Sequence, residues 1–291
     1  TVERLQVFDL EAMRAYPVLL PTIQQAIANL LTVYEPEFLR FGYSLFLSFA
    51  TILIVWQGVK MMFSHDSLGD SMFEFAKLLM LISFGYSFIA FYEAPLPGIG
   101  VSFSNLITDQ TAYFQSVLEA RAFDNIYRHF DDLSEHFLQP DAWSILANLI
   151  YWAMLLLIAL AKGLSLAVIA FGLIASAVCG LLGPIFVPFF IVPKLEWLFW
   201  GWLKAFIQYS FVPVVAIAFL MIFEQFVYRY VTTLPPTITS AEYGVYGLQA
   251  VAVVVTFCIG IALVPSLTSS IFSGQGGQSI LSSVPRLIRM R

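Results

Sequence analysis

Long apolar runs alternate with short polar segments along most of this chain. A helix that crosses a bilayer needs about 20 predominantly apolar residues, and six runs reach that length. They cover residues 38–63, 73–92, 143–161, 164–192, 203–228 and 244–272. The pattern predicts an all-α, polytopic helical integral membrane protein with five to six transmembrane helices and one long helical extramembrane loop.

The composition strengthens this prediction. The chain has 291 residues, of which 59% are hydrophobic and 11% are charged, whereas soluble domains carry roughly 25% charged residues. The lipid bilayer is therefore the first partner that we expect. No Lys- and Arg-rich run is interleaved with aromatic residues, so direct, sequence-specific nucleic-acid binding is not expected. Cys179 and Cys258 fall inside apolar runs, where a disulfide is not expected.

The polar segments divide the chain into regions. We expect an N-terminal tail with an amphipathic helix (1–37), two transmembrane helices (38–92), an acidic extramembrane loop (93–142), a transmembrane bundle (143–272) with an aromatic surface turn (183–209), and a Gly/Ser-rich basic tail (273–291). The helix of the first region is expected over 17–36, because Pro17 and Pro21 favour its start and Pro36 its end. It either lies on the bilayer or docks on a neighbouring subunit.

The second span begins with a charged pair. Glu74 and Lys77 are three residues apart and therefore share one helical face. This spacing predicts an ion pair whose side chains reach the lipid headgroups.

The long loop carries the densest polar side chains. Its pattern predicts amphipathic helices interrupted near Asp124, with an aromatic stripe that either rests on the bilayer or meets a partner. His129, Asp132 and His136 have a spacing that metal sites can use, but neither a fourth ligand nor a rigid frame is evident. We therefore interpret them as a solvated acidic helix face and predict no metal site and no cofactor.

Small residues recur every fourth position in the fourth apolar run. Gly172, Ser176 and Gly180 follow this period, and Gly183 comes next to them. Such a stripe lets helix backbones approach closely in a membrane. It predicts either packing within one subunit or a seam between subunits, and both interpretations stay open.

The most distinctive segment is the aromatic turn. Three tryptophans fall within six residues among prolines and isolated charges, a composition typical of the membrane–water boundary. We expect the tryptophans to anchor this turn and the charged residues to form ion pairs within or between subunits. The residues in question are Pro193, Lys194, Glu196, Trp197, Trp200, Trp202 and Lys204.

Catalytic chemistry finds little support. All three histidines lie outside the apolar runs, and the serines within the runs have no evident base, so the chain is not expected to be an enzyme. A secondary transporter or channel for a small solute is the alternative. Transporters typically pair two broken helices around mid-membrane charges. Here one region, 183–193, is broken, Lys162 falls at a predicted turn, and Glu224 lies near a helix end close to Arg229.

The run Val192–Phe211 (VPKLEWLFWGWLKAFIQYSF), the prolines before it, the long loop after two spans and the glycine-rich tail carry a family resemblance. Together they resemble the TrbL/VirB-type polytopic inner-membrane subunit of type IV secretion and conjugation machines. The resemblance implies a multi-pass protein of the bacterial inner membrane that forms a ring-like homo-oligomer, a pentamer. It also implies contacts with pilus and other secretion-machine subunits, in a platform for substrate translocation and pilus assembly.

The resemblance and the charge distribution imply different orientations. The family places the N-terminus and the long loop in the periplasm and the tail, with Arg286, Arg289 and Arg291, in the cytoplasm, which takes an odd number of crossings. Six spans would instead put both termini on one side. That side would hold ten of the 14 Lys and Arg residues, which favours the cytoplasm for both termini. The two accounts agree only if one apolar segment does not cross completely.

Overall fold

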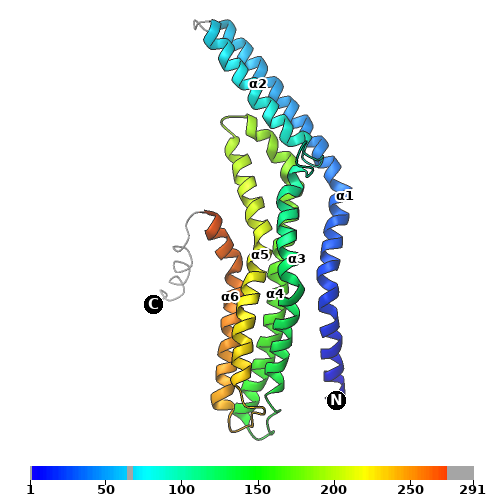
Figure 1. Ribbon diagram of the computed structural model, residues 1–291, viewed down its shortest axis with the longest axis vertical. Coiled ribbons are helices and arrows are strands. Elements are labelled where there is room, and N and C mark those ends of the chain that lie inside the picture. The colour runs from blue at the N-terminus through cyan, green and yellow to red at the C-terminus, as the bar shows by residue number, and fades with distance from the viewer. Residues whose placement is uncertain (1, 64–67, 274–291) are drawn as a thin grey trace. The chain divides into compact units, whose positions relative to one another are not determined.

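The fold consists of helices and short connecting segments in the part of the chain that the computed structural model describes. This part comprises the backbone of residues 2–63 and 68–273, with side chains except those of residues 2–21, 68, 107, 110, 112–124 and 273. Its α-helices are α1 (Val2–Phe63), α2 (Leu68–Ala90), α3 (Phe103–Glu135), α4 (Ile145–Phe186), α5 (Glu196–Thr233) and α6 (Leu248–Ser273) (Figure 1). A 3-10 helix, η1 (Val187–Ile191), follows α4, and a π-helical turn, η2 (Tyr243–Gly247), precedes α6. Since these residues contain no strand, the all-α prediction is confirmed.

Five helical stretches are long and apolar enough to cross a membrane, against the six that hydropathy alone separates. They are Thr22–Phe63, Gly69–Ala90, Ile145–Ile191, Glu196–Thr233 and Tyr243–Phe272. The difference lies in α4, which runs without a break through Lys162 and Gly163, so the turn predicted there is wrong. A single glycine costs only about 1 kcal/mol in a helix interior, and Lys162 has a carboxylate partner inside the protein.

Two other predicted helix breaks are also wrong. α1 is helical through Pro36, where the 17–36 helix was expected to end. A proline removes one N–H donor, and good helix formers on both sides let the helix continue. α3 is a single helix through Asp124, where an interruption was expected. Its sequence contains no Pro or Gly that would stop it.

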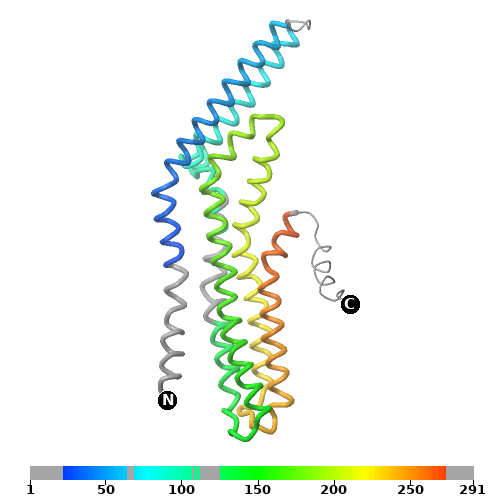
Figure 2. The backbone as a smooth tube through the Cα atoms, turned by 180° about the vertical axis from the view of Figure 1, so that it is seen from behind, coloured from blue at the N-terminus to red at the C-terminus, as the bar shows by residue number. Residues whose placement is uncertain are grey.

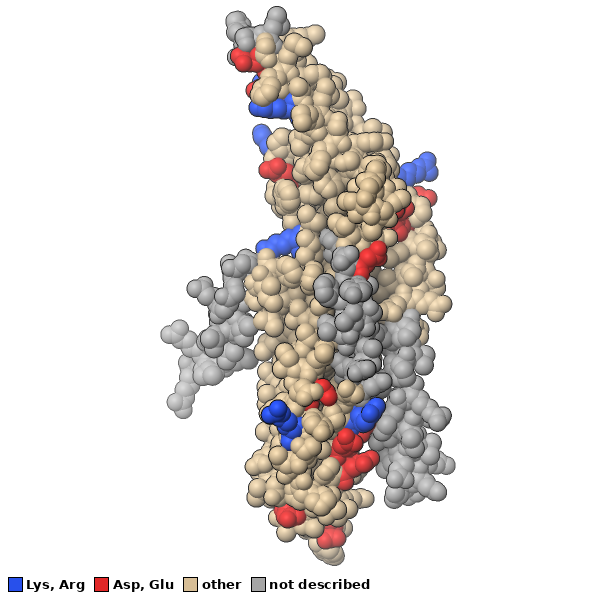
Figure 3. Space-filling view, in the orientation of Figure 1, with Lys and Arg blue, Asp and Glu red and all other residues tan. Residues whose placement is uncertain are grey.

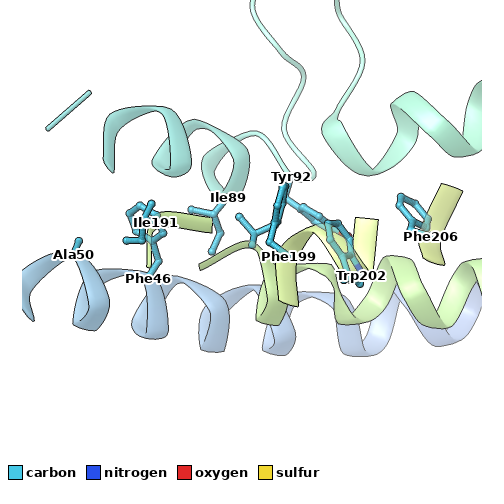
Figure 4. Close-up of a cluster of buried hydrophobic side chains, with 9 residues drawn as sticks. Phe46, Ala50, Ile89, Tyr92, Ile191, Phe199, Trp202 and Phe206 are labelled. Atoms are coloured by element: carbon cyan, nitrogen blue, oxygen red, sulfur yellow. The ribbon is translucent and has the colours of Figure 1, made fainter. Parts of the chain in front are cut away.

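The chain forms two compact units. The first comprises Thr1–Gln110 and Ile174–Ile207, and the second comprises Thr111–Leu173 and Gln208–Arg291. In the first unit α1 and α2 form a hairpin, and η1 packs on both helices. Its core consists mainly of large apolar and aromatic side chains from α1, α2, η1 and α5 (Figure 4). These core residues are Phe46, Ala50, Ile89, Tyr92, Val187, Ile191, Phe199, Trp202 and Phe206.

An exposed ion pair joins the two helices of the hairpin. The Lys60 Nζ lies 2.8 Å from the Glu74 Oε2, and both side chains are about half exposed. Glu74 therefore binds α1 rather than its neighbour Lys77, and the predicted Glu74–Lys77 pair is wrong. The Lys77 Nζ instead lies 4.2 Å from the centroid of the Phe73 ring.

In the second unit, parts of α3, α4, α5 and α6 run side by side as a four-helix bundle (Figures 1 and 2). Aromatic rings meet in its core, where the Phe257 centroid lies 5.1 Å from that of Phe130 and 4.9 Å from that of Phe223. Two connecting loops meet at one end, because the Tyr243 hydroxyl donates to the Leu138 carbonyl at 2.6 Å.

The outer surfaces of α4, α5 and α6 are rich in exposed apolar side chains. Examples are Ile145, Leu149, Leu156, Ile222, Ile259 and Ile271. Charged side chains are sparse among the described residues in the space-filling view (Figure 3). Exposed apolar surface on this scale is characteristic of a protein that contacts lipid or other subunits.

Candidate functional site

Pro184 leaves a carbonyl in α4 that another part of the chain must satisfy. A proline has no N–H, so the Gly180 carbonyl four residues earlier loses its helical donor. The Tyr92 hydroxyl, from the segment after α2, donates to this carbonyl. The Trp202 indole Nε1 of α5 donates to the preceding carbonyl, that of Cys179, at 2.8 Å. Two aromatic side chains therefore supply hydrogen bonds where α4 contains its proline.

Burial keeps these donors in place. Tyr92 is fully buried and Trp202 is 6% exposed. Burial also raises the pKa of the Tyr92 hydroxyl, so the group remains protonated and able to donate. An unsatisfied carbonyl in such apolar surroundings would cost about 1–3 kcal/mol.

Glycines bring the backbones close around Pro184. A Cβ added at Gly183 would lie 1.8 Å from the Tyr92 hydroxyl oxygen, and one at Gly42 of α1 would lie 2.3 Å from the Pro184 carbonyl oxygen. We call Gly42, Tyr92, Gly183, Pro184 and Trp202 the Pro184 cluster. It joins α1, the segment after α2, α4 and α5 within the first unit.

The other small residues of the stripe also pack against other parts of the same subunit. A Cβ at Gly172 would lie 2.6 Å from the Pro213 Cδ of α5, inside the second unit. Ser176 is 8% exposed, and the Gly180 carbonyl binds Tyr92. These contacts explain close packing within one subunit, while a seam between subunits stays a prediction.

The three tryptophans of the aromatic turn occupy different environments. Trp197 and Trp200 are 65% and 53% exposed, whereas Trp202 belongs to the core. The other candidate residues of the turn, Pro193, Lys194, Glu196 and Lys204, are exposed.

The charged residues of this turn make no ion pair with any other residue that the structure describes. Lys194, Glu196 and Lys204 are thus available to other molecules, and ion pairs between subunits stay a prediction. The tail residues Arg286, Arg289 and Arg291 lie outside the described residues.

A second polar site lies inside the four-helix bundle. The Lys162 Nζ of α4 donates to the Asp131 Oδ1 of α3, with side chains 12% and 30% exposed. The Tyr127 hydroxyl of α3 donates to the Lys162 backbone carbonyl at 2.9 Å. Lys162 therefore links two helices, although the sequence predicted a turn at this position.

His129 connects α3 to α5 in the same bundle. Its Nε2 lies 3.3 Å from the Glu224 Oε1 and its Nδ1 lies 3.4 Å from the Asp132 Oδ2. The interpretation of His129, Asp132 and His136 as a solvated acidic face is therefore wrong for His129, whose side chain is 16% exposed and faces Glu224 of α5, whereas Asp132 is 43% exposed. We call Asp131, Asp132, His129, Lys162 and Glu224 the charge cluster.

Neither the Pro184 cluster nor the charge cluster was predicted as a whole from the sequence. Pro184 inside an apolar run was a usable signal, because it implies a donor for the Gly180 carbonyl. Lys162 and Glu224 were a second signal, since charges inside spans usually have partners. The partners themselves come from residues far away in the sequence.

His136 does not join the charge cluster through its side chain, since its Nδ1 lies 2.7 Å from the Asp132 backbone oxygen. Among the residues described, no group of His, Cys, Asp and Glu is placed to hold a metal ion.

Comparison with known proteins identifies a family. A family model described as TrbL/VirB6 plasmid conjugal transfer protein matches residues 50–267. This region contains the whole charge cluster and, apart from Gly42, the whole Pro184 cluster. No curated protein matches the chain significantly.

Proposed function

Because this chain belongs to the TrbL/VirB6 plasmid conjugal transfer family, and is thereby a multi-pass membrane component of a conjugal transfer or type IV secretion system, we propose that it forms an oligomeric platform for substrate translocation and pilus assembly. The observation that carries this proposal is the family match over residues 50–267. Its place would be the bacterial inner membrane. Its partners would be further copies of the chain, in a pentamer, and other secretion-machine and pilus subunits. It would have no catalytic chemistry of its own.

The aromatic turn supports a role in assembly. Trp197 and Trp200 are exposed, and so are Lys194 and Glu196 in the same turn. The turn therefore presents both apolar and charged side chains at the protein surface. Tryptophan is enriched among the residues that dominate binding at protein interfaces. This surface is therefore our candidate for a contact with another subunit.

The five apolar helices support an odd number of crossings. Five crossings place Asp141, between α3 and α4, and Lys194, between η1 and α5, on opposite sides of the membrane. Six crossings would place them on the same side. The stretch Ile145–Ile191 has 47 residues and extends over about 70 Å, against a hydrocarbon core of about 30 Å, so in a single crossing part of it would project from the membrane.

Thiol labelling distinguishes the two topologies. Single cysteines replace Asp141 or Lys194 in a chain whose Cys179 and Cys258 are changed to alanine, and intact cells are treated with a membrane-impermeant maleimide. We expect one of the two positions to react in intact cells and the other only after lysis. Reaction of both positions under the same condition would contradict five crossings.

Trp200→Ala tests the proposed role of the aromatic turn. We expect plasmid transfer to fall on the order of tenfold or more, because a large aromatic contact would be lost, while the amount of protein in the membrane stays unchanged. Trp152→Ala is the matched control, since Trp152 on α4 is 55% exposed and Trp200 is 53% exposed. If both variants transfer the plasmid equally well, the turn has no special role.

One observation favours the alternative, a transporter or channel for a small solute. Lys162 and Glu224 lie in ion pairs inside the bundle rather than at its ends, and charges within spans often mark ion or solute pathways. Glu224→Gln separates the two functions. A variant that changes solute flux into membrane vesicles and leaves plasmid transfer intact would support the transporter.

A further inference from the structure

The side chain of His129 lies between two carboxylates within the four-helix bundle. Its Nδ1 is 3.4 Å from the Asp132 Oδ2 on α3, and its Nε2 is 3.3 Å from the Glu224 Oε1 on α5. The side chains of His129 and Glu224 are 16% and 13% exposed. The Tyr228 ring covers one side of the imidazole, with centroids 5.3 Å apart. Both ring nitrogens therefore face carboxylate oxygens at a site largely shielded from solvent.

The hydrogen-bonding capacity of imidazole depends on its protonation. A neutral imidazole has one N–H and one nitrogen lone pair, whereas the imidazolium ion has two N–H groups. An ionised carboxylate only accepts hydrogen bonds. A neutral His129 would thus leave either Asp132 or Glu224 facing a lone pair, whereas a protonated His129 donates to both in charge-assisted hydrogen bonds.

The other charged side chains near His129 either have partners of their own or are exposed. Lys162 of α4 is paired with Asp131. Glu224 accepts a further hydrogen bond from the Gln225 Nε2 at 3.1 Å, which is neutral. The sequence of α6 contains no ionisable side chain other than Cys258. The remaining charged residues nearby in sequence, Arg128, Glu135 and Arg229, are exposed. Among the described residues, His129 is the group whose ring nitrogens lie 3.4 Å from Asp132 and 3.3 Å from Glu224 and that can place a positive charge between them.

We propose that His129, Asp132 and Glu224 form a proton-binding site that joins α3 to α5 when the proton is bound. The proton resides on the imidazole, so uptake adds one positive charge between two negative ones. Asp132 is 43% exposed and His129 16%, so Asp132 is the more exposed of these two members of the site. The contact between α3 and α5 is strong at low pH and weakens as pH rises and His129 loses its proton.

Amide hydrogen exchange on the full chain in lipid nanodiscs tests this site. Exchange of the 125–135 segment is measured from pH 5.5 to 8.5 and corrected for the intrinsic pH dependence of amide exchange. We expect corrected exchange to be faster at the high end on the order of tenfold, because charge-assisted hydrogen bonds are lost. Segments of α6 serve as the internal reference and should not change. A pH-independent 125–135 segment in the wild-type chain would overturn the proposal.

Variants identify the group that titrates. His129→Gln and Glu224→Gln should each remove the pH dependence of the 125–135 segment, and the second keeps the proposal testable if the first does not fold. His136→Gln, one residue beyond the end of α3, is the matched control and should retain the dependence. Persistence of the effect in both His129→Gln and Glu224→Gln, or its loss in His136→Gln, would rule out this site.

Discussion

Gly183→Ala should lower the free energy of unfolding by about 2–4 kcal/mol. The new Cβ would lie 1.8 Å from the Tyr92 hydroxyl oxygen and 2.4 Å from its Cζ. Tyr92 is fully buried, so its ring cannot move aside without displacing its neighbours in a close-packed core. Moving the ring would also remove the donor from the Gly180 carbonyl. Unfolding of the purified protein in mild detergent, followed by circular dichroism against added denaturing detergent, measures the change.

Gly163→Ala is the control for this prediction. It makes the same change in the same helix at a position where an added Cβ has no neighbour within 4 Å, so it should stabilise the protein by up to about 1 kcal/mol, the cost of a glycine in a helix interior. In a Tyr92→Leu background, Gly183→Ala should cost much less than in the wild type, because the two residues are in contact. Equal stability of the Gly183→Ala and Gly163→Ala single variants would refute the close contact at Pro184.

Lys162→Met should destabilise the protein by about 3–5 kcal/mol, the usual effect of removing one partner from a buried ion pair. The Lys162 Nζ binds the Asp131 carboxylate, with side chains 12% and 30% exposed. Methionine keeps most of the side-chain length and apolar character, so the loss reports the charge rather than packing. Asp131 would be left with an uncompensated charge in the bundle. The same detergent denaturation applies, with thermal melting as a second measurement.

Two further variants check the electrostatic origin of this loss. Lys60→Met breaks the Lys60–Glu74 pair, whose side chains are 52% and 54% exposed, and should cost much less than Lys162→Met, because exposed ion pairs contribute little to stability. The double variant Lys162→Met with Asp131→Leu removes both charges and should recover much of the stability. A double variant as unstable as Lys162→Met alone would show that the pair itself is not the cause.

The sequence predicted the helices better than their ends. Apolar runs identified every span, but α4 was divided at Lys162 because a charge next to a glycine is typical of a surface turn. The charge lies inside the protein because Asp131 neutralises it, and local pattern carries no information about a partner 31 residues away. Pro36 shows the same limit. A proline can end a long helix or lie within it, as Pro36 does in α1, and the local sequence does not say which.

For the candidate sites too, the sequence showed the residue patterns but not their surroundings in the fold. The small-residue stripe and the three tryptophans were visible as patterns, yet their environments were not. Trp202 is buried and donates to the Cys179 carbonyl, whereas Trp197 and Trp200 are exposed. The helical period alone could not decide which side of α5 faces the core, because apolar residues of α5 itself occupy every side of the helix.

By itself, the sequence determined that this is an all-α polytopic membrane protein and that it resembles the conjugal transfer family. Hydropathy and residue spacing are local properties, and a bilayer imposes helices on any long apolar segment. Only the tertiary structure decided that Tyr92 satisfies the Gly180 carbonyl, that Lys162 binds Asp131 and that His129 bridges Asp132 and Glu224. These pairings join residues between 3 and 95 positions apart, and the long-range ones depend on which faces of the helices pack together, which a pattern read along one chain does not contain.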